Sequence, residues 1–382
     1  MPPTRSGVSD YAVELLAELG RRAKIRVLAP PGGVRPETWT FGNGVEIVAA
    51  DTPPEADEVS LIHLGNNPHH AGLLDRLKGP NTVAVLHDLV LHHLLVEISG
   101  GEGDALEAHL VKAHGDSGAV IARARRFGLT GPRDPFLFPA RGALLDKVTG
   151  VIVHSNWAEG VIAREFPGLP VAAVGLAVAD PGRVLVAAER GRLGIAPDEV
   201  VLMHLGFLTP EKGLEQILTG LAAARKVGIP ARLVLVGEGR GIEEIRKAAA
   251  TVGVGSLVSA TGWVEPELFP AVPAAADLGV VMRTPSAGET SAAAVRFLAT
   301  GTPVAVSGLH QFLEWPEEAA PRVTPGPSAP AELARLLVEA ARGGEGWDAR
   351  RRAARAAYEE NHRPADAAEA IVDFLDSLAP TH

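Results

Sequence analysis

One loop of this sequence combines glycines with a lysine in a way that suits an anionic ligand. The segment Gly206–Gly213 (GFLTPEKG) follows an apolar run and leads into a helical pattern. Glycines let a backbone approach a ligand closely, a helix start offers free N–H groups, and Lys212 adds a full positive charge. These features suit a phosphate or diphosphate. An ordinary strand–turn–helix with a solvated lysine would show the same pattern.

A second segment in the same kind of place favours the anion interpretation. Residues 288–291 read Gly-Glu-Thr-Ser, they lie between an apolar run and a helical pattern, and Arg283 precedes them. Thr290 or Ser291 can cap that helix. Open α/β folds bind ligands at the carboxyl edge of the sheet, so both loops are expected at one edge. A third loop, Gly237-Glu-Gly239, lacks the full dinucleotide fingerprint, which makes a nicotinamide role poorly supported.

Eight of the 13 histidines lie between His63 and His114. The pair His87-Asp88 follows an apolar run and is therefore expected at a strand's carboxyl end, where it suits hydroxyl recognition or proton handling. Histidine and aspartate are also common metal ligands. A metal phosphohydrolase of the HD type would need this pair on a helix, whereas Thr82–Leu86 predicts a strand. We interpret His63, His109 and His114 as surface or gap-filling residues.

Short β-rich runs alternate with helical patterns in the second half of the chain, which predicts a parallel sheet covered by helices on both faces. The runs are continuous, as expected for strands buried on both sides. The expected strands are Val200–Leu205, Leu233–Val236, Leu257–Val264, Leu278–Met282 and Pro303–Val306. The expected helices are Glu211–Lys226, Ile242–Val252 and Ser291–Thr300.

The first half repeats this α/β theme less regularly. A helix is expected at Tyr11–Leu19 with no strand-length segment before it, so either a first strand is missing from this sequence or Lys24–Leu28 opens the sheet. The other expected strands are Val45–Ala49, Val59–Leu64, Thr82–Leu86 and Val148–Val153. We expect a first lobe over residues 1–178, a second over 179–362, and a last helix over 363–382 that crosses back to the first lobe.

Composition excludes several classes of protein. The net charge of −10 argues against nucleic acid as the main partner, because such binding needs a basic face. The absence of cysteine excludes disulfides, thiolate metal sites and a cysteine nucleophile. The sequence has neither an apolar run of about 18 residues nor a signal pattern, so we expect a cytoplasmic location. The local run of Arg123, Arg125, Arg126 and Arg133 is interpreted as a solvated helix face. Contact with a membrane surface stays open, although the net charge does not support it.

The order of these loops resembles the retaining GT-B glycosyltransferases of family 4 over nearly the whole chain. The residues that carry the resemblance are Gly7 in Pro3-Thr-Arg-Ser-Gly7, His87-Asp88, Gly206 with Lys212-Gly213, Val236 to Gly239, Gly262-Trp263-Val264, Asp277, and Glu289 through Val304. The resemblance implies two Rossmann-like, doubly wound α/β lobes facing a cleft. It also implies a nucleoside diphosphate sugar as the donor.

Roles for individual residues follow from this resemblance. It implies that His87 lies beside the transferred sugar and that Glu289 contacts the same sugar, so these two are assigned to catalysis. The residues assigned to donor binding are Gly7 in a first-lobe loop, Gly206, Lys212, Val264 at the nucleobase, Arg283, Thr290 and Ser291. The residues assigned to the acceptor side are Asn66, His69 and Asp88. No metal and no cofactor are expected, because Lys212 and helix-end amides take over the neutralising role.

Two departures from the family pattern lie in the second lobe. Phe207 stands where the family commonly has an arginine. The usual pair of glutamates eight positions apart would fall at Gly288 and Arg296, and Glu289 is one position late. We interpret the Gly-Glu-Thr-Ser segment as a variant in which Glu289 replaces the first glutamate and in which Arg296 or Arg283 faces phosphate.

The implied reaction is transfer of a hexosyl group to an acceptor hydroxyl with retention of anomeric configuration. A nucleotide-sugar epimerase is the nearest alternative, and a catalytically silent GT-B scaffold partner is a second. An NAD-dependent dehydrogenase ranks last for want of the glycine fingerprint. The donor base and the acceptor, whether a glycan, a lipid-linked sugar or a small molecule, stay open.

Overall fold

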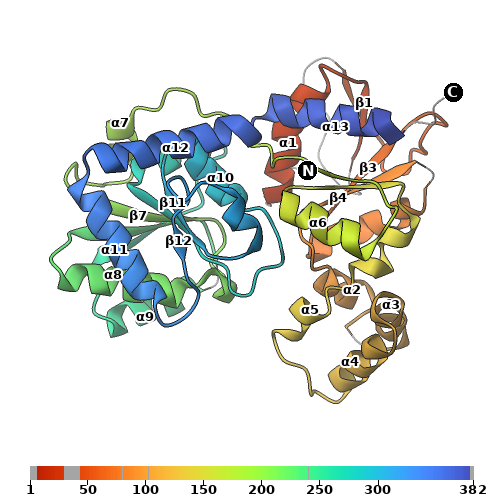
Figure 1. The fold of residues 1–382 in the computed structure, drawn as a ribbon, viewed down its shortest axis with the longest axis horizontal. Coiled ribbons are helices and arrows are strands. Elements are labelled where there is room, and N and C mark those ends of the chain that lie inside the picture. Colours follow the sequence, from red (N-terminus) through yellow and green to blue (C-terminus); the bar gives the residue numbers. More distant parts are fainter. Residues whose placement is uncertain (1–6, 30–43, 80, 102, 240, 379–382) are drawn as a thin grey trace. The chain divides into compact units, whose positions relative to one another are not determined.

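The computed structural model describes residues 7–29, 44–79, 81–101, 103–239 and 241–378, and the chain forms two compact units (Figure 1). The first unit comprises Met1–Ala177, Pro285–Thr290 and Pro364–His382, and the second comprises Val178–Thr284 and Ser291–Arg363. The sequence did not predict that a short piece of the second half, Pro285–Thr290, belongs to the first unit.

The second unit is built around one six-stranded parallel sheet. Its strands lie in the order β12-β11-β10-β7-β8-β9, and every neighbouring pair is parallel. They are β7 (Val200–Leu205), β8 (Ala231–Val236), β9 (Val258–Gly262), β10 (Leu278–Val281), β11 (Val304–Ser307) and β12 (Arg322–Val323). The chain winds outward from β7 to β9 and then returns to β10 on the other side of β7. β7 and β10 therefore flank the point where the winding reverses, which is where open α/β sheets bind ligands.

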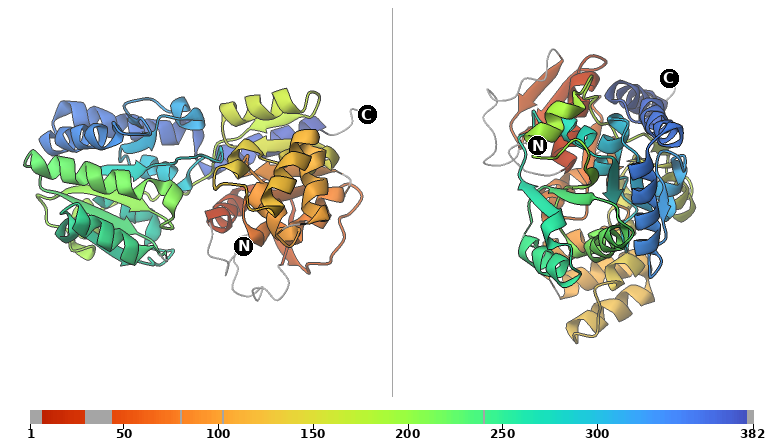
Figure 2. Two further views of the ribbon diagram at one scale, coloured as in Figure 1. Left: turned by 90° about the horizontal axis from the view of Figure 1, so that it is seen from below. Right: turned by 90° about the vertical axis from the view of Figure 1, so that its left-hand side faces the viewer.

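Helices cover both faces of this sheet (Figure 2). On one face α8 (Leu214–Lys226), α9 (Ile242–Thr251) and α11 (Ala329–Arg342) share an apolar core with the strands. On the other face lie α10 (Ala292–Ala299) and α12 (Glu345–Asn361), which pack on each other. α10 also packs closely on the sheet, because a Cβ on Gly279 of β10 would lie 2.5 Å from Cγ of Phe297 in α10. The predicted α/β class with helices on both faces is therefore confirmed.

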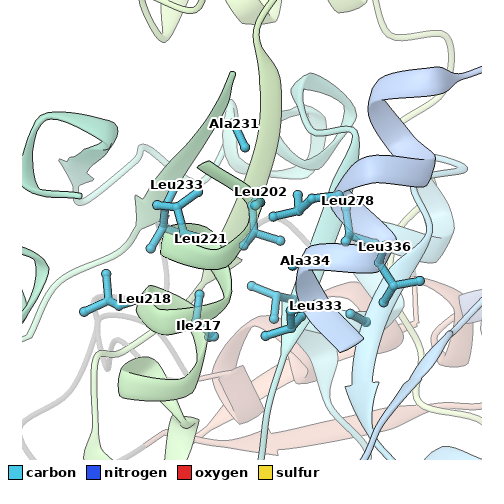
Figure 3. Packing of buried hydrophobic residues seen from close by; sticks show 14 of the residues in the cluster. Leu202, Ile217, Leu218, Leu221, Ala231, Leu233, Leu278, Leu333, Ala334 and Leu336 are labelled. Atoms are coloured by element: carbon cyan, nitrogen blue, oxygen red, sulfur yellow. The ribbon is translucent and has the colours of Figure 1, made fainter. Parts of the chain in front are cut away.

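Buried leucines fill the space between α8, α11 and the sheet (Figure 3). The side chains that meet there include Ile217, Leu218 and Leu221 of α8, Leu333 and Leu336 of α11, and Leu202, Leu233 and Leu278 of the strands. The two helices approach closely at Gly220, where a Cβ would lie 2.9 Å from Cβ of Leu333. This packing fixes the sheet that carries the two candidate loops.

Several predicted elements of the second unit have different limits in the structure, and two of these differences follow from glycines with positive φ. The helix expected from Glu211 begins only at Leu214, because Pro210–Lys212 forms a 3₁₀ turn and Gly213 has φ 62°. A left-handed residue interrupts helical hydrogen bonding, and glycine adopts that conformation readily. The extended segment expected over Leu257–Val264 is a shorter strand that ends at Gly262, where φ is +70°.

Asp277 connects three other elements to the start of β10. Its Oδ2 accepts hydrogen bonds from the backbone N of Val201 in β7 at 2.8 Å and from Nη2 of Arg190 in α7 (Val186–Arg192) at 2.7 Å. Its Oδ1 accepts from Nη2 of Arg351 in α12 at 3.2 Å. One largely buried carboxylate thus satisfies two arginines and a strand amide at once.

The described strands of the first unit form two separate parallel sheets. β1 (Ile25–Leu28) pairs with β2 (Val45–Val48), and β3 (Ser60–Leu64), β4 (Thr82–Leu86), β5 (Gly150–Val153) and β6 (Val171–Ala173) pair in that order. Within the described part of the chain β1 is not paired with β3. Lys24–Leu28 therefore does not open the main sheet, because among the described strands β1 pairs with β2 alone and β3 pairs with β4 alone.

Helices of the first unit come from both ends of the sequence. α13 (Pro364–Leu378) packs against α1 (Gly7–Leu19). It also lies on β5, because a Cβ at Gly150 would be 2.8 Å from Cδ1 of Leu378. α6 (Asn156–Glu165) follows Ser155, whose Oγ caps the helix by accepting a hydrogen bond from the backbone N of Ala158. The 3₁₀ helix η2 (Pro68–Lys78) follows β3.

A helical segment connects β4 to β5 and extends away from the sheet of the first unit (Figure 1). It consists of α2 (His92–Ile98), α3 (Asp104–His114), α4 (Asp116–Arg126) and α5 (Asp134–Leu137). No helix in the described ranges is long and apolar enough to cross a membrane.

A cluster of imidazoles lies under α1, where β3, β4 and β5 end. The ring of Tyr11 in α1 is 5.0 Å from that of His87 and 5.3 Å from that of His154. Nδ1 of His63 lies 3.1 Å from Nε2 of His87. Burial lowers the pKa of His63 to about 3 and that of His154 to about 4, and it holds the pKa of His87 well below its ordinary value. All three rings are therefore neutral in the folded protein at neutral pH.

These lowered pKa values predict acid sensitivity of the first unit. Below about pH 6.5 the unfolded chain takes up protons on these rings, whereas the folded chain does not. The free energy of unfolding should therefore decrease as the pH is lowered, by about 2 kcal/mol per ring at about pH 5. Above about pH 7.5 these rings should add no slope. Urea unfolding at several pH values measures the effect. A wild-type stability that does not change between about pH 5 and about pH 7.5 would contradict the interpretation.

The Asp277 contacts predict a stability defect. Asp277→Ala should lower the free energy of unfolding by about 2–4 kcal/mol, because it removes the one carboxylate that Arg190, Arg351 and a strand amide share. Denaturant unfolding followed by far-ultraviolet circular dichroism gives the value. Asp198→Ala, at an exposed position before β7, should change it by less than about 0.5 kcal/mol.

Candidate functional site

Two loops of the second unit meet at the carboxyl ends of β7 and β10. The backbone N of Thr284 donates to the carbonyl O of Glu211 at 3.0 Å. Gly213 packs against β10 so closely that a Cβ there would lie 2.9 Å from Cβ of Met282. The Gly206–Gly213 loop and the segment after β10 are thus joined at the point where the winding of the sheet reverses.

Positive charge collects at this point. The ammonium Nζ of Lys212 turns back over the end of β7 and lies 3.6 Å from the position that a Cβ on Gly206 would occupy. His204, buried in β7, has its pKa lowered to about 3, chiefly by burial and then by the nearby charges of Lys212 and Arg283. The backbone N of Arg283 donates to Oγ of Ser307 at the end of β11, at 2.8 Å. The charges of Lys212 and Arg283 therefore both act on the end of β7, and positive charge at such a place suits an anion.

The glycines after β8 are explained by contact between loops. Gly237 has φ 135°, and a Cβ there would lie 2.5 Å from the carbonyl O of Gly206. A Cβ on Gly239 would lie 2.9 Å from Cβ of Leu208. The backbone N of Gly237 also donates to the carbonyl O of Gly262, at 3.1 Å. Val264 follows β9 by two residues at this same edge, and β9 lies two strands, about 10 Å, from β7.

Ser291 and Thr290 have different roles in the structure. Oγ of the buried Ser291 accepts from the backbone N of Ala294 at 3.4 Å, so Ser291 is the N-cap of α10. Oγ1 of Thr290 instead donates to the carbonyl O of His154 in the first unit, at 3.0 Å. Arg296 is buried with its guanidinium 5.2 Å from the ring centre of Phe269. Of the two arginines considered for phosphate, Arg283 is therefore the one whose charge acts at the end of β7.

Glu289 lies in the piece of the second half that belongs to the first unit. The backbone N of Leu89 donates to the carbonyl O of Ala287 at 2.8 Å, and a Cβ on Gly288 would lie 3.0 Å from Cγ of Leu89. Oε2 of Glu289 accepts from the backbone N of Ala287 at 2.9 Å. The carboxylate thus stabilises its own turn, which is seated on the loop that follows β4.

This seating brings the two residues assigned to catalysis onto adjacent loops of one unit. His87 comes two residues before Leu89, and its ring lies 4.9 Å from that of His154. His154 in turn accepts the Thr290 hydrogen bond. Sequence reasoning missed His154 and Tyr11. A histidine directly after the run that forms β5 was the available signal for His154, because His87 occupies the same position after β4.

The acceptor-side residues are only partly brought together. The backbone N of Asn66 donates to Oδ2 of Asp88 at 2.8 Å. The side-chain Oδ1 of Asn66 accepts from the backbone N of His93 at 2.9 Å, and so it caps the start of α2. His69 is exposed on η2, and its backbone N donates to Oδ1 of Asn67 at 3.0 Å. Asn66 and Asp88 therefore tie the loops after β3 and β4 together, whereas His69 stands apart from this contact.

The placement of Gly7 in a loop is wrong. Gly7 is the first residue of α1, and a Cβ there would meet nothing within 4 Å. The helix extends this far because Tyr11, Leu15 and Leu19 recur at helical spacing and are buried. The Pro3–Ser6 part of the motif lies outside the described residues. Within those residues no group of three or more histidines and carboxylates is arranged to hold a metal ion.

Comparison with known proteins gives three kinds of likeness. Residues 199–342 match the family model for group 1 glycosyl transferases. Over 130 residues the chain is 36% identical to a GDP-mannose-dependent alpha-(1-6)-phosphatidylinositol monomannoside mannosyltransferase of Mycobacterium tuberculosis. That match covers 33% of each protein, so the chain spans about a third of the length of the curated relatives it matches.

Solved structures resemble the whole chain in fold. WaaG, a glycosyltransferase of lipopolysaccharide biosynthesis, has a TM-score of 0.63 at 14% identity, over 99% of this chain and 97% of its own. Anabaena Alr3699/HepE, solved with UDP and glucose, has a TM-score of 0.63 at 16% identity, over 98% and 97%. Sucrose-phosphate synthase from Thermosynechococcus elongatus has a TM-score of 0.59 at 19% identity, over 83% and 73%. The chain therefore has the GT-B fold of these glycosyltransferase structures, and residues 199–342 of its second unit resemble the group 1 glycosyl transferases.

Proposed function

We propose that the chain is a glycosyltransferase that takes a hexosyl group from a nucleoside diphosphate sugar and transfers it to an acceptor hydroxyl with retention. The observation that carries this proposal is the joined pair of loops at the ends of β7 and β10, with the charges of Lys212 and Arg283 acting on the same end of β7. A diphosphate is an anion that suits two such loops at the reversal point of a parallel sheet. The relatives support this donor class, since one is named for GDP-mannose and another was solved with UDP.

In the proposed reaction the protein stabilises the leaving group. The bond from the anomeric carbon to the diphosphate oxygen breaks, and the acceptor oxygen bonds to that carbon on the same face. The acceptor's proton passes to the departing diphosphate oxygen. Lys212, Arg283 and the first amides of α10 after Ser291 offset the negative charge that builds up there. These groups let the reaction proceed without a metal ion in this proposal.

His87 and Glu289 would act on the sugar rather than on the diphosphate. His87 is neutral at pH 7 because its pKa is lowered by burial and by the neighbouring histidines. A neutral imidazole exchanges a hydrogen bond with a sugar hydroxyl, and that hydrogen bond can orient the ring. The seating of the Glu289 turn on the loop after β4 supports a joint role for these two residues.

Replacement of Lys212 tests the assignment of the diphosphate site. Lys212→Ala should lower kcat by roughly a hundredfold, because one preorganised charge at the leaving group is lost. Release of nucleoside diphosphate from the donor measures the turnover. Lys226→Ala, which removes an exposed lysine at the end of α8, should keep wild-type turnover. If Lys212→Ala turned over like the wild type, the assignment would fall.

A panel of nucleoside diphosphates tests the donor class and the alternatives. Binding raises the free energy of unfolding by about 2.7 kcal/mol at a ligand concentration of about 100 Kd. At least one member of the panel should therefore raise the melting temperature of the wild type, and the shift should shrink in Lys212→Ala. A silent scaffold partner would show no shift with any nucleotide. An epimerase would interconvert the bound sugar in the absence of any acceptor, whereas a transferase would not.

A further inference from the structure

The helical segment between β4 and β5 carries the most exposed apolar side chains of the described chain. Leu129 is 77% exposed, Phe127 and Leu137 are 72% exposed, and Val120 is 69% exposed. Phe127 and Leu129 directly follow α4, and Leu137 ends α5. Single exposed apolar residues are common on protein surfaces, but four within 18 positions of one projecting segment mark an interaction surface.

The backbone beneath these side chains is well packed. Gly118 of α4 lies against α3 so closely that a Cβ there would be 2.0 Å from the carbonyl O of Leu110. Gly118, Ile121 and Ala122 form the buried face of α4. Because residues three and seven positions apart share a helix face, Val120, Arg123 and Phe127 lie together on the opposite side. The packed pair of α3 and α4 thus holds Val120 and Phe127 outward.

Charge separates this surface from the rest of the protein. From Val120 to Leu137 the sequence has four arginines and one acid, Asp134, in a chain of net charge −10. Oδ2 of Asp134 is occupied by the backbone N of Gly131, at 2.5 Å. Arg126 is paired with Asp104 and Glu107.

The remaining two arginines with exposed side chains keep their charge available. Arg123 and Arg133 are exposed and form no ion pair with any residue that the structure describes. We call the surface made by these two arginines and the exposed apolar residues the basic tip. Its members are Val120, Arg123, Phe127, Leu129, Arg133 and Leu137.

We propose that the basic tip binds the surface of an anionic phospholipid bilayer. Phenylalanine and leucine next to arginine are the combination that inserts at the boundary between headgroups and acyl chains. Arginines add attraction to anionic lipids. The chain as a whole is acidic and is repelled by such a surface, so the attraction has to come from the basic tip.

The tip is also connected to the residues assigned to the acceptor side. Phe136 of α5 packs its ring 6.2 Å from that of His93, and Nδ1 of His93 lies 2.8 Å from Nδ2 of Asn66. These contacts link α5 at the tip to the loops after β3 and β4. This inference does not depend on the proposed reaction, because lipid binding can be measured without any substrate.

Vesicle flotation with the full-length chain tests the proposal. The wild type should float with vesicles of equal parts phosphatidylglycerol and phosphatidylcholine and should stay unbound with phosphatidylcholine alone. Phe127→Ser with Leu129→Ser, and separately Arg123→Glu with Arg133→Glu, should each lower the bound-to-free ratio by about tenfold or more. Added salt should weaken the wild-type binding.

A matched control uses exposed residues of the second unit. Arg183→Glu with Leu185→Ser removes one exposed arginine and one exposed leucine there, and it should leave flotation unchanged. Each variant should have the melting temperature of the wild type, which shows that a loss of flotation does not come from misfolding. The proposal is overturned if the wild type does not float with anionic vesicles, or if the control lowers flotation as much as the tip variants do. It is equally overturned if the tip variants abolish self-association in sedimentation while vesicle binding is absent, because the surface is then a protein interface.

Discussion

The close approach of the Gly206–Gly213 loop to the end of β10 is the constraint on which the candidate site depends. Gly213 leaves no room for a side chain beside Met282, and the hydrogen bond from Thr284 to Glu211 fixes the two loops to each other. Because β7 and β10 are neighbours only through the reversal of the strand order, this contact can form at one place in the sheet. A side chain at position 213 would separate the loops and move Lys212 away from the end of β7.

The main features of the second unit were readable from the sequence because they follow local rules. Continuous apolar runs predicted β7 with its observed limits, since a strand covered on both faces needs no polar alternation. The N-cap at Ser291 was one of two residues that the sequence offered. The start of α8 was misjudged because its cause, the left-handed conformation of Gly213, is imposed by packing against β10. A close contact between segments about 70 residues apart leaves only a glycine in the sequence as its trace.

The first unit departs further from expectation because its organisation depends on distant contacts. The imidazole cluster joins residues from α1 and from the ends of three strands, so no local pattern could reveal it. The separate pairing of β1 with β2 likewise depends on which segments meet and in which register. The strand propensity of a single segment does not determine this pairing. The seating of the Glu289 turn beside Leu89 joins positions almost 200 residues apart. Their residue types made His87 and Glu289 candidate site residues, but only the folded structure shows that they lie on adjacent loops.

The effect of a charged side chain in this protein depends on its nearby partners and not on the net charge of the chain. Arg190 and Arg351 are engaged by one carboxylate, Asp277, and Arg126 is engaged by two acids of α3. The sequence interpretation of the arginine run as a solvated face treated its four members alike. The structure divides them, because Arg126 is paired whereas Arg123 and Arg133 stand beside apolar residues that no core covers. A strongly acidic protein can therefore present a basic apolar surface, since partners within a few ångströms outweigh distant charges that salt screens.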